Sequence, residues 1–175
     1  MYTNNMKTLI VFDRKDYDIS SQRYIKNSAR AIIITNNKVA MLYSNRYKFY
    51  CFPGGSIEKD ETIIETLIRE TREEAGLMIK QNSIKEFGMI IEIRKDLKAE
   101  NGIYEQNEYY YYCEVEENIF EQKLTQNEIE AGYELKFVTL DEAINQNELE
   151  IEIKRIYTEA ETYILKLLKK ELGII

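Results

Sequence analysis

The sequence contains no histidine. This absence excludes catalytic triads and dyads that use histidine as the base, and it removes the most common ligand of catalytic zinc. Any catalysis by this chain therefore depends on carboxylates, lysine, tyrosine or cysteine. Carboxylates are abundant, with 31 Asp and Glu among 175 residues, and their oxygens prefer hard cations such as Mg²⁺ or Mn²⁺.

Cysteine and proline are scarce as well. The two cysteines, Cys51 and Cys113, have no second cysteine at the spacing of a metal site or a redox motif. We expect two reduced thiols, with a single disulfide between them as the alternative. The only proline is Pro53, and no Pro/Gly/Ser-rich linker divides the chain, so residues 1–175 are predicted to form one domain.

Long apolar runs and an excess of positive charge are also missing. No stretch is long enough to span a membrane, and the N-terminal "MYTNNMKTLIVF" lacks the small-residue cleavage site of a signal peptide. We therefore expect a cytoplasmic protein with no membrane partner. The formal net charge of −7 argues against binding of a nucleic-acid polymer. It leaves room for a small anionic substrate, because a bound metal or a local arginine can reverse the field.

Hydrophobic periodicity predicts strands first and helices later. Strands are expected over 7–12, 28–34, 38–44, 83–94, 107–115 and 134–140, with a tight turn at Asn36-Asn37. Helices are expected over 61–76, from Asp141, and over about 153–173, and residues 1–27 form an extension that contributes the first strand. This order favours an α+β fold with a mixed sheet between helices. The C-terminal amphipathic helix either covers that sheet or forms the surface of a homodimer.

The segment "RETREEAG" (69–76) concentrates acidic residues on one edge of the predicted helix. Glu70, Glu73 and Glu74 fall within an arc of about 100° beside its apolar face, whereas merely solvated acids would lie opposite that face. Like charges at this spacing repel each other. A divalent cation converts the repulsion into ligation. The spacing therefore predicts a metal site where the helix meets the rest of the protein.

The segment "FPGG" (52–55) precedes that helix and supplies a rigid turn. Pro53 fixes φ at its entry, and the two glycines let the backbone approach the helix and direct carbonyl groups into the site. Glu61 stands at the start of the helix, where the helix dipole favours a negative charge. Gly76 is predicted to end the helix.

The stretch from Gly55 to Leu77, "GSIEKDETIIETLIRETREEAGL", resembles the Nudix box. That pattern is Gly, five residues, Glu, seven residues, Arg-Glu, a hydrophobic residue, any residue, Glu-Glu, any residue, Gly and a hydrophobic residue. One position departs from it, because Thr71 stands at the first hydrophobic position. The positions that match are Gly55, Glu61, Arg69, Glu70, Glu73, Glu74, Gly76 and Leu77.

The resemblance implies a Nudix fold, with a mixed sheet sandwiched between helices (α/β/α), and a hydrolase function. Nudix hydrolases cleave a nucleoside diphosphate linked to another moiety, by attack of water on phosphorus. Glu70, Glu73 and Glu74 would bind Mg²⁺ or Mn²⁺ together with the Gly54 carbonyl, and a glutamate would accept the proton of the water. Arg69 would orient these glutamates. The alternative is a catalytically idle Nudix domain that senses a nucleotide ligand; such a domain usually has a degraded box.

The resemblance also assigns supporting roles. Gly55, Glu61 and Gly76 would hold the loop against the helix and shape the site. The family often takes a further carboxylate from the loop before the last strand, where Glu128 and Glu130 are candidates. The alternative is that both are ordinary acidic residues on the surface.

Substrate recognition is less constrained by the sequence. Arg46 lies shortly before the box, and it is either a substrate-binding cation or a solvated one. The expected substrate is a small nucleotide-like diphosphate. A nucleoside triphosphate and a sugar nucleotide both remain open.

Overall fold

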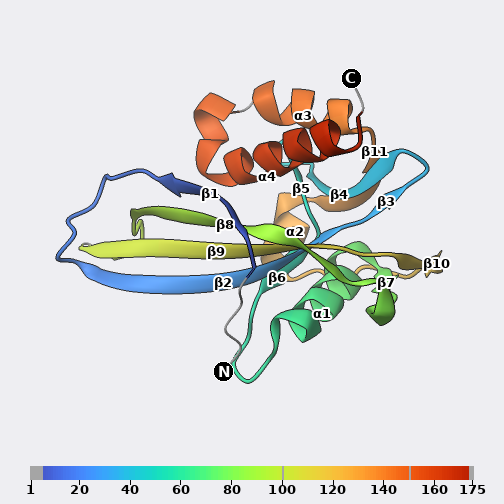
Figure 1. The fold of residues 1–175 in the computed structure, drawn as a ribbon, viewed down its shortest axis with the longest axis horizontal. Coiled ribbons are helices and arrows are strands. Elements are labelled where there is room, and N and C mark those ends of the chain that lie inside the picture. The colour runs from blue at the N-terminus through green and yellow to red at the C-terminus, as the bar shows by residue number, and fades with distance from the viewer. Residues whose placement is uncertain (1–5, 100, 150, 174–175) are drawn as a thin grey trace.

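The computed structural model describes residues 6–99, 101–149 and 151–173. Sheets form the middle of the molecule (Figure 1). Helix α1 (Ile63–Ala75) lies on one side of them, and α3 (Leu140–Leu149) and α4 (Ile151–Glu171) lie on the other. The expected α+β fold, with sheet between helices, is confirmed.

The largest sheet has five strands in the order β1-β8-β9-β2-β6. It is mixed, because β1 runs parallel to β8 and β2 runs parallel to β9, while β8–β9 and β2–β6 are antiparallel. Its strands are β1 (Thr8–Asp13), β2 (Gln22–Ile32), β6 (Gly54–Ser56), β8 (Lys85–Lys95) and β9 (Gly102–Tyr112).

The remaining strands form a second sheet and a separate ladder of two strands, β7 and β10. The second sheet has the order β11-β4-β3, and β5 pairs with β4. At the turn between β3 and β4, Asn36 and Asn37 have φ values of 50° and 60°, so the predicted turn is confirmed. The remaining elements are β3 (Ile34–Thr35), β4 (Lys38–Ser44), β5 (Tyr50–Cys51), β7 (Leu77–Ile79), η1 (Gln81–Ser83), β10 (Val115–Ile119), α2 (Gln126–Ala131) and β11 (Tyr133–Val138).

The sequence prediction placed the second strand too late. Residues 22–27, which were assigned to the N-terminal extension, form the first half of β2 and pair in register with β9. This half is polar and mostly exposed, so it lacks the apolar alternation that marks a strand. The short strands β5 and β6 and the helix α2 are likewise not among the predicted elements.

Both ends of α1 are fixed by capping. The Thr62 hydroxyl accepts a hydrogen bond from the Glu65 N–H at 3.2 Å, and the Glu65 carboxylate accepts one from the Thr62 N–H at 2.8 Å. Gly76 ends the helix with φ 70°, as predicted. A Cβ at Gly76 would lie 2.0 Å from the Phe120 carbonyl oxygen, so this position has no room for a side chain.

The core lies on both sides of the sheets. Leu67 and Ala75 of α1 are buried in one hydrophobic cluster, and Ile164, Leu165 and Leu168 of α4 are buried in the other. The C-terminal helix therefore covers the sheets. Both cysteines are buried and free. In the described segments, no helix has both the length and the apolar character needed to cross a membrane.

Candidate functional site

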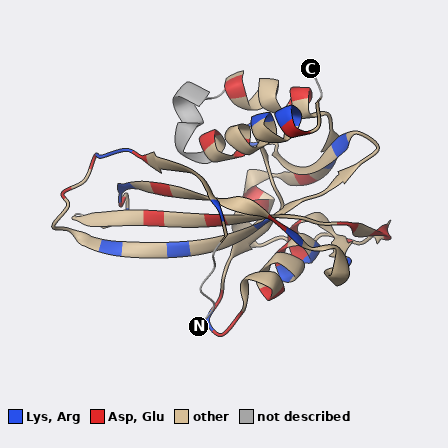
Figure 2. Ribbon diagram, viewed as in Figure 1, with Lys and Arg blue, Asp and Glu red and all other residues tan. Residues whose placement is uncertain are grey.

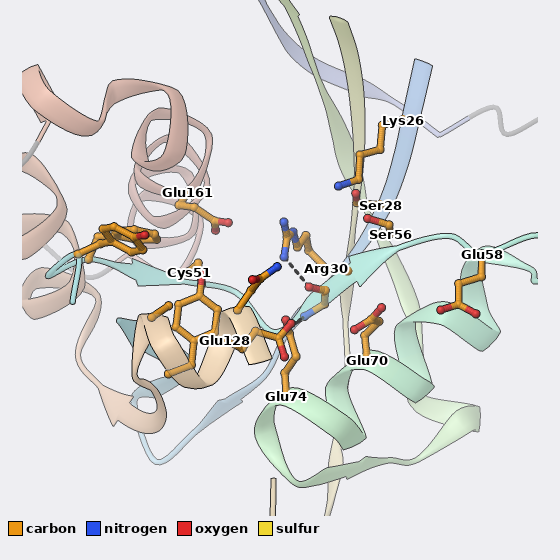
Figure 3. A pocket seen from close by; sticks show the side chains of 17 residues that line it. Lys26, Ser28, Arg30, Cys51, Ser56, Glu58, Glu70, Glu74, Glu128 and Glu161 are labelled. Carbon is orange, nitrogen blue, oxygen red and sulfur yellow. Dashed lines mark hydrogen bonds between the residues drawn. The ribbon is translucent and has the colours of Figure 1, made fainter. Parts of the chain in front are cut away.

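A cavity of about 500 Å³ lies between α1, α2, α4 and the sheets (Figure 3). Its acidic side chains come from three helices and the turn before α1. The side chains and backbone that line it are Lys26, Ser28, Arg30, Tyr47, Phe49, Cys51, Gly54, Gly55, Ser56, Glu58, Glu70, Glu74, Asn127, Glu128, Ala131, Tyr133 and Glu161.

Arg69 connects three glutamates of the box. Its Nε and Nη2 atoms donate to the two carboxylate oxygens of Glu61 at 2.8 and 2.9 Å. Its Nη1 atom donates to Glu70 at 2.9 Å and to Glu73 at 3.2 Å. The hydrogen bonds from Arg69 lower the pKa of Glu61 to about 2. Arg69 is thus hydrogen-bonded to three glutamates of the box, and its role in orienting them stays a prediction.

Glu74 and Glu70 are the two box carboxylates that line the cavity. Glu74 is buried, and its Oε2 atom accepts a hydrogen bond from the Gly54 N–H at 2.9 Å. Burial raises the pKa of Glu74 to about 8, and burial also raises the pKa of Glu70. In both cases the ionised form lacks sufficient compensation. A cation in the cavity would supply it.

The turn before α1 lies directly against these carboxylates. A Cβ at Gly55 would lie 2.4 Å from the Glu70 carboxyl carbon. The Glu70 carboxylate can therefore occupy this position only because residue 55 has no side chain. The Gly54 carbonyl accepts a hydrogen bond from the Arg30 Nη1 atom at 2.6 Å. The oxygen predicted as a metal ligand is thus held by an arginine in this structure.

Arg30 is the central cation of the cavity. It lies on β2, its side chain is 18% exposed, and its Nε and Nη2 atoms both donate to a Glu108 oxygen of β9 at 3.1 Å. Sequence analysis missed it, because nothing in the apolar strand "SARAIII" distinguishes this arginine from an exposed one. Glu161 of α4 was missed too, and its backbone partner is the Phe52 N–H at 3.2 Å. The sequence feature that could have identified it is its spacing, because Glu161 lies on the same helix face as the apolar residues Ile164, Leu165 and Leu168.

Six predicted site residues do not line the cavity. Arg69, Glu61 and Gly76 are described above, and the other three are Glu73, Glu130 and Arg46. Glu73 has a side chain that is 42% exposed and turns toward Arg69. Glu130 accepts a hydrogen bond from the Gln126 amide, and the Arg46 guanidinium lies 5.3 Å from the centre of the Tyr47 ring. Glu128, in contrast, lines the cavity from α2 (Figure 3). Of the two acids proposed from that loop, only Glu128 is placed beside Glu70 and Glu74.

The oxygen donors fit a divalent cation in type. Glu70 and Glu74 offer carboxylates of raised pKa, and Glu128 and the Gly54 backbone offer further oxygens on the same cavity. Mg²⁺ prefers such hard ligands, and it usually also keeps water or substrate phosphate. Across residues 6–99, 101–149 and 151–173, no three of the potential His, Cys, Asp or Glu ligands converge closely enough to form a complete protein-only site.

Comparison with known proteins agrees with the box. The NUDIX domain family model matches residues 26–160. The uncharacterized Nudix hydrolase YvcI of Bacillus subtilis (strain 168) is 33% identical over 73 residues. That match covers 42% of this chain and 45% of YvcI, so it spans less than half of the relative's length.

Solved structures show the same fold at low sequence identity. A NUDIX hydrolase from Nitrosomonas europaea has a TM-score of 0.55 and 18% identity, covering 71% of this chain and 79% of that one. The MutT NUDIX hydrolase from Burkholderia pseudomallei has a TM-score of 0.50 and 14% identity, covering 67% and 85%. Since the family model also spans most of the sequence, from residue 26 to residue 160, this chain belongs to the Nudix family.

Proposed function

We propose that this protein is a divalent-metal-dependent pyrophosphohydrolase that cleaves a nucleoside diphosphate linked to another moiety. The observation that carries the proposal is the placement of Glu70 and Glu74 in one cavity, against the glycine turn, with Arg69 bonded to Glu70. Mg²⁺ or Mn²⁺ is the proposed cofactor. A small nucleotide-like diphosphate is the proposed substrate.

The carboxylates of the cavity are the proposed metal ligands. Glu70 and Glu74 would hold the cation, with Glu128 as a further ligand. When bound, the cation would neutralise phosphate charge and lower the pKa of a water nucleophile. Arg69 keeps Glu70 and Glu73 oriented.

The substrate's phosphates have their own partners in the cavity. Lys26 and Arg30 provide positive charge, and Ser28 and Ser56 add hydroxyl donors on the same wall. Positive charge preorganised around the phosphates stabilises the charge that develops when water attacks phosphorus. A carboxylate of the box would accept the proton of that water.

A nucleotide panel with Mg²⁺ or Mn²⁺ tests the proposal. The wild type should split the diphosphate linkage of a nucleotide into two phosphorylated products, and Glu74→Gln and Glu70→Gln should each reduce kcat/KM by about 100-fold, because each removes a negative charge from the cavity. Glu130→Gln is the matched control, since Glu130 lies outside the cavity and should retain wild-type turnover. Chelation of the metal should abolish turnover.

The outcomes separate enzyme from sensor. Binding of a nucleotide without turnover would favour the idle sensor domain. Turnover that both substitutions leave unchanged would contradict the assignment of the site. Metal should also raise the melting temperature of the wild type more than that of Glu74→Gln, because the variant binds the ion less tightly.

A further inference from the structure

Glu161 gives the cavity a second acidic side. It projects from α4 toward the cavity, whereas Glu70 projects from α1, and Arg30 lies between the two (Figure 3). Lys26, Ser28 and Ser56 lie on the Glu70 side of Arg30, and Cys51 lies on the Glu161 side. The two sides of the cavity therefore differ in chemistry.

The carboxylate of Glu161 is short of hydrogen-bond donors. Its side chain is buried, and within the described part of the chain its one hydrogen bond is from the Phe52 N–H at 3.2 Å. Arg30 is directed at Glu108 and at the Gly54 carbonyl instead. Burial raises the pKa of Glu161 to about 8, and the nearby charge of Arg30 offsets this only in part. A group that donates a hydrogen bond to the carboxylate would stabilise its ionised form.

Aromatic residues line the cavity together with this carboxylate. Cys51 lies on the Glu161 side, and the Tyr133 hydroxyl interacts with its thiol. Tyr47 and Phe49, in the segment just before β5, form a stacked pair with ring centres 6.4 Å apart. Flat aromatic surface beside a hydrogen-bond acceptor suits a planar or polyhydroxyl group with N–H or O–H donors.

We propose that Glu161 selects the non-phosphate end of the substrate by accepting its N–H or O–H donors and by repelling a second phosphate group. The substrate class is then a nucleotide with a single phosphate chain and a sugar and base that carry no further phosphate, such as a nucleoside 5′-triphosphate, rather than a ligand with phosphates at both ends. This proposal rests on the proposed function, since it places the phosphate chain beside Glu70 and Glu74.

Electrostatics explains the selectivity. When Glu161 is ionised, its carboxylate and a phosphate that share the cavity repel strongly, because the effective dielectric constant is well below that of water. A neutral sugar or base with donors gains charge-assisted hydrogen bonds at the same place. One residue therefore both attracts the correct ligand and rejects the wrong one.

Matched ligands and variants test this. We compare ATP and GTP with their 3′-diphosphorylated counterparts in the wild type, in Glu161→Gln and in Glu159→Gln. The wild type should prefer the single-chain nucleotide by at least about tenfold in kcat/KM. Glu161→Gln should raise KM for that nucleotide about tenfold and reduce the preference to about threefold or less. The control residue Glu159 lies on the same helix and pairs with Arg14 outside the cavity, so its variant should keep the wild-type preference.

A binding measurement separates this inference from the hydrolase proposal. Thermal shifts with Mg²⁺ and each nucleotide report affinity without turnover. If the wild type hydrolyses nothing but binds with the stated preference, and Glu161→Gln loses that preference, the hydrolase proposal fails and the role of Glu161 stands. If neither triphosphate binds, or if Glu161→Gln keeps the wild-type preference, the role of Glu161 is wrong.

Discussion

At the scale of single residues, two arginines organise the site through different partners. Arg69 is bonded to side chains of the box, and Arg30 is bonded to the backbone carbonyl of Gly54 and to Glu108. Both backbone polar groups of Gly54 are thus hydrogen-bonded, because its N–H donates to Glu74 and its carbonyl accepts from Arg30. The sequence motif identified the first arginine but contained no trace of the second.

Arg30→Ala should reduce the free energy of unfolding by about 3–5 kcal/mol, because Glu108 is left buried without its counter-ion. Arg30→Lys should be intermediate, since lysine keeps the charge but lacks the planar fork. Urea unfolding measures both. Arg23→Ala is the control on the same strand. Arg23 pairs with Glu105 at an exposed position, and its loss should cost at most about 1 kcal/mol. Equal losses for Arg30→Ala and Arg23→Ala would contradict this account.

The Glu61–Arg69 pair predicts a pH dependence of stability. The pKa of Glu61 is about 2 when folded, against 4.5 as the ordinary value, so its contribution is present above pH 4.5 and is lost as the pH falls toward 2. In Glu61→Gln this loss should vanish. The difference in unfolding free energy between wild type and variant should shrink by about 1 kcal/mol over that range in urea titrations. Glu116→Gln, at an exposed acid, should follow the wild type; a constant difference between wild type and Glu61→Gln would refute the link.

At the scale of elements, the contact of the β6 turn with α1 determines where Glu70 lies. The backbone of Gly55 does not need a positive φ, so alanine is conformationally acceptable there, but its Cβ would press on the Glu70 carboxylate. Side chains shift more readily than backbone. The turn therefore acts on activity more than on folding.

Gly55→Ala should lower kcat/KM at least tenfold while changing the free energy of unfolding by less than about 1 kcal/mol. Steady-state kinetics and urea unfolding on the same protein check both parts. In the Glu70→Gln background, Gly55→Ala should add little further loss, because both changes act on one carboxylate. Fully additive losses would show that Gly55 acts elsewhere.

Sequence reasoning succeeded where a local signal controls structure. The glycine that ends α1 and the turn at Asn36-Asn37 are each encoded within a few residues. It failed for the first half of β2, which is held by backbone pairing with a distant strand and needs no apolar side chains. The position of Glu128, unlike that of Glu130, depends on the capping of α2, which was not predicted, because the Glu128 carboxylate accepts a hydrogen bond from the Thr125 N–H.

At the scale of the molecule, the acidic residues of the cavity come from elements that are far apart in the sequence. Acidic residues are spread over strands and helices (Figure 2). Those in the cavity come from α1, α2, α4 and the turn before α1. The Nudix box could identify only the α1 contribution. The remainder depends on how α2 and α4 pack, which long-range contacts decide.

Helix α4 couples the hydrophobic core to the cavity. Leu165 is fully buried, and Leu165→Ala should reduce the free energy of unfolding by about 2–5 kcal/mol because it leaves a cavity in the core. Lys166→Ala is the control, since Lys166 forms a partly exposed ion pair with Glu148 and should cost at most about 1 kcal/mol. Chemical unfolding of both variants measures these changes. A reduction of the free energy of unfolding by less than about 1 kcal/mol for Leu165→Ala would mean that α4 contributes little to the core.

The parallel pairing of β2 with β9 also has a consequence for the order of assembly. Gln22 pairs with Gly102, and Ile32 pairs with Tyr112, so the centre of the large sheet joins parts of the chain that are made far apart in time. During synthesis, β2 must remain without this partner until β9 has left the ribosome. Pairings of such high contact order form slowly. The polar first half of β2 lowers the risk that the waiting strand associates with other chains.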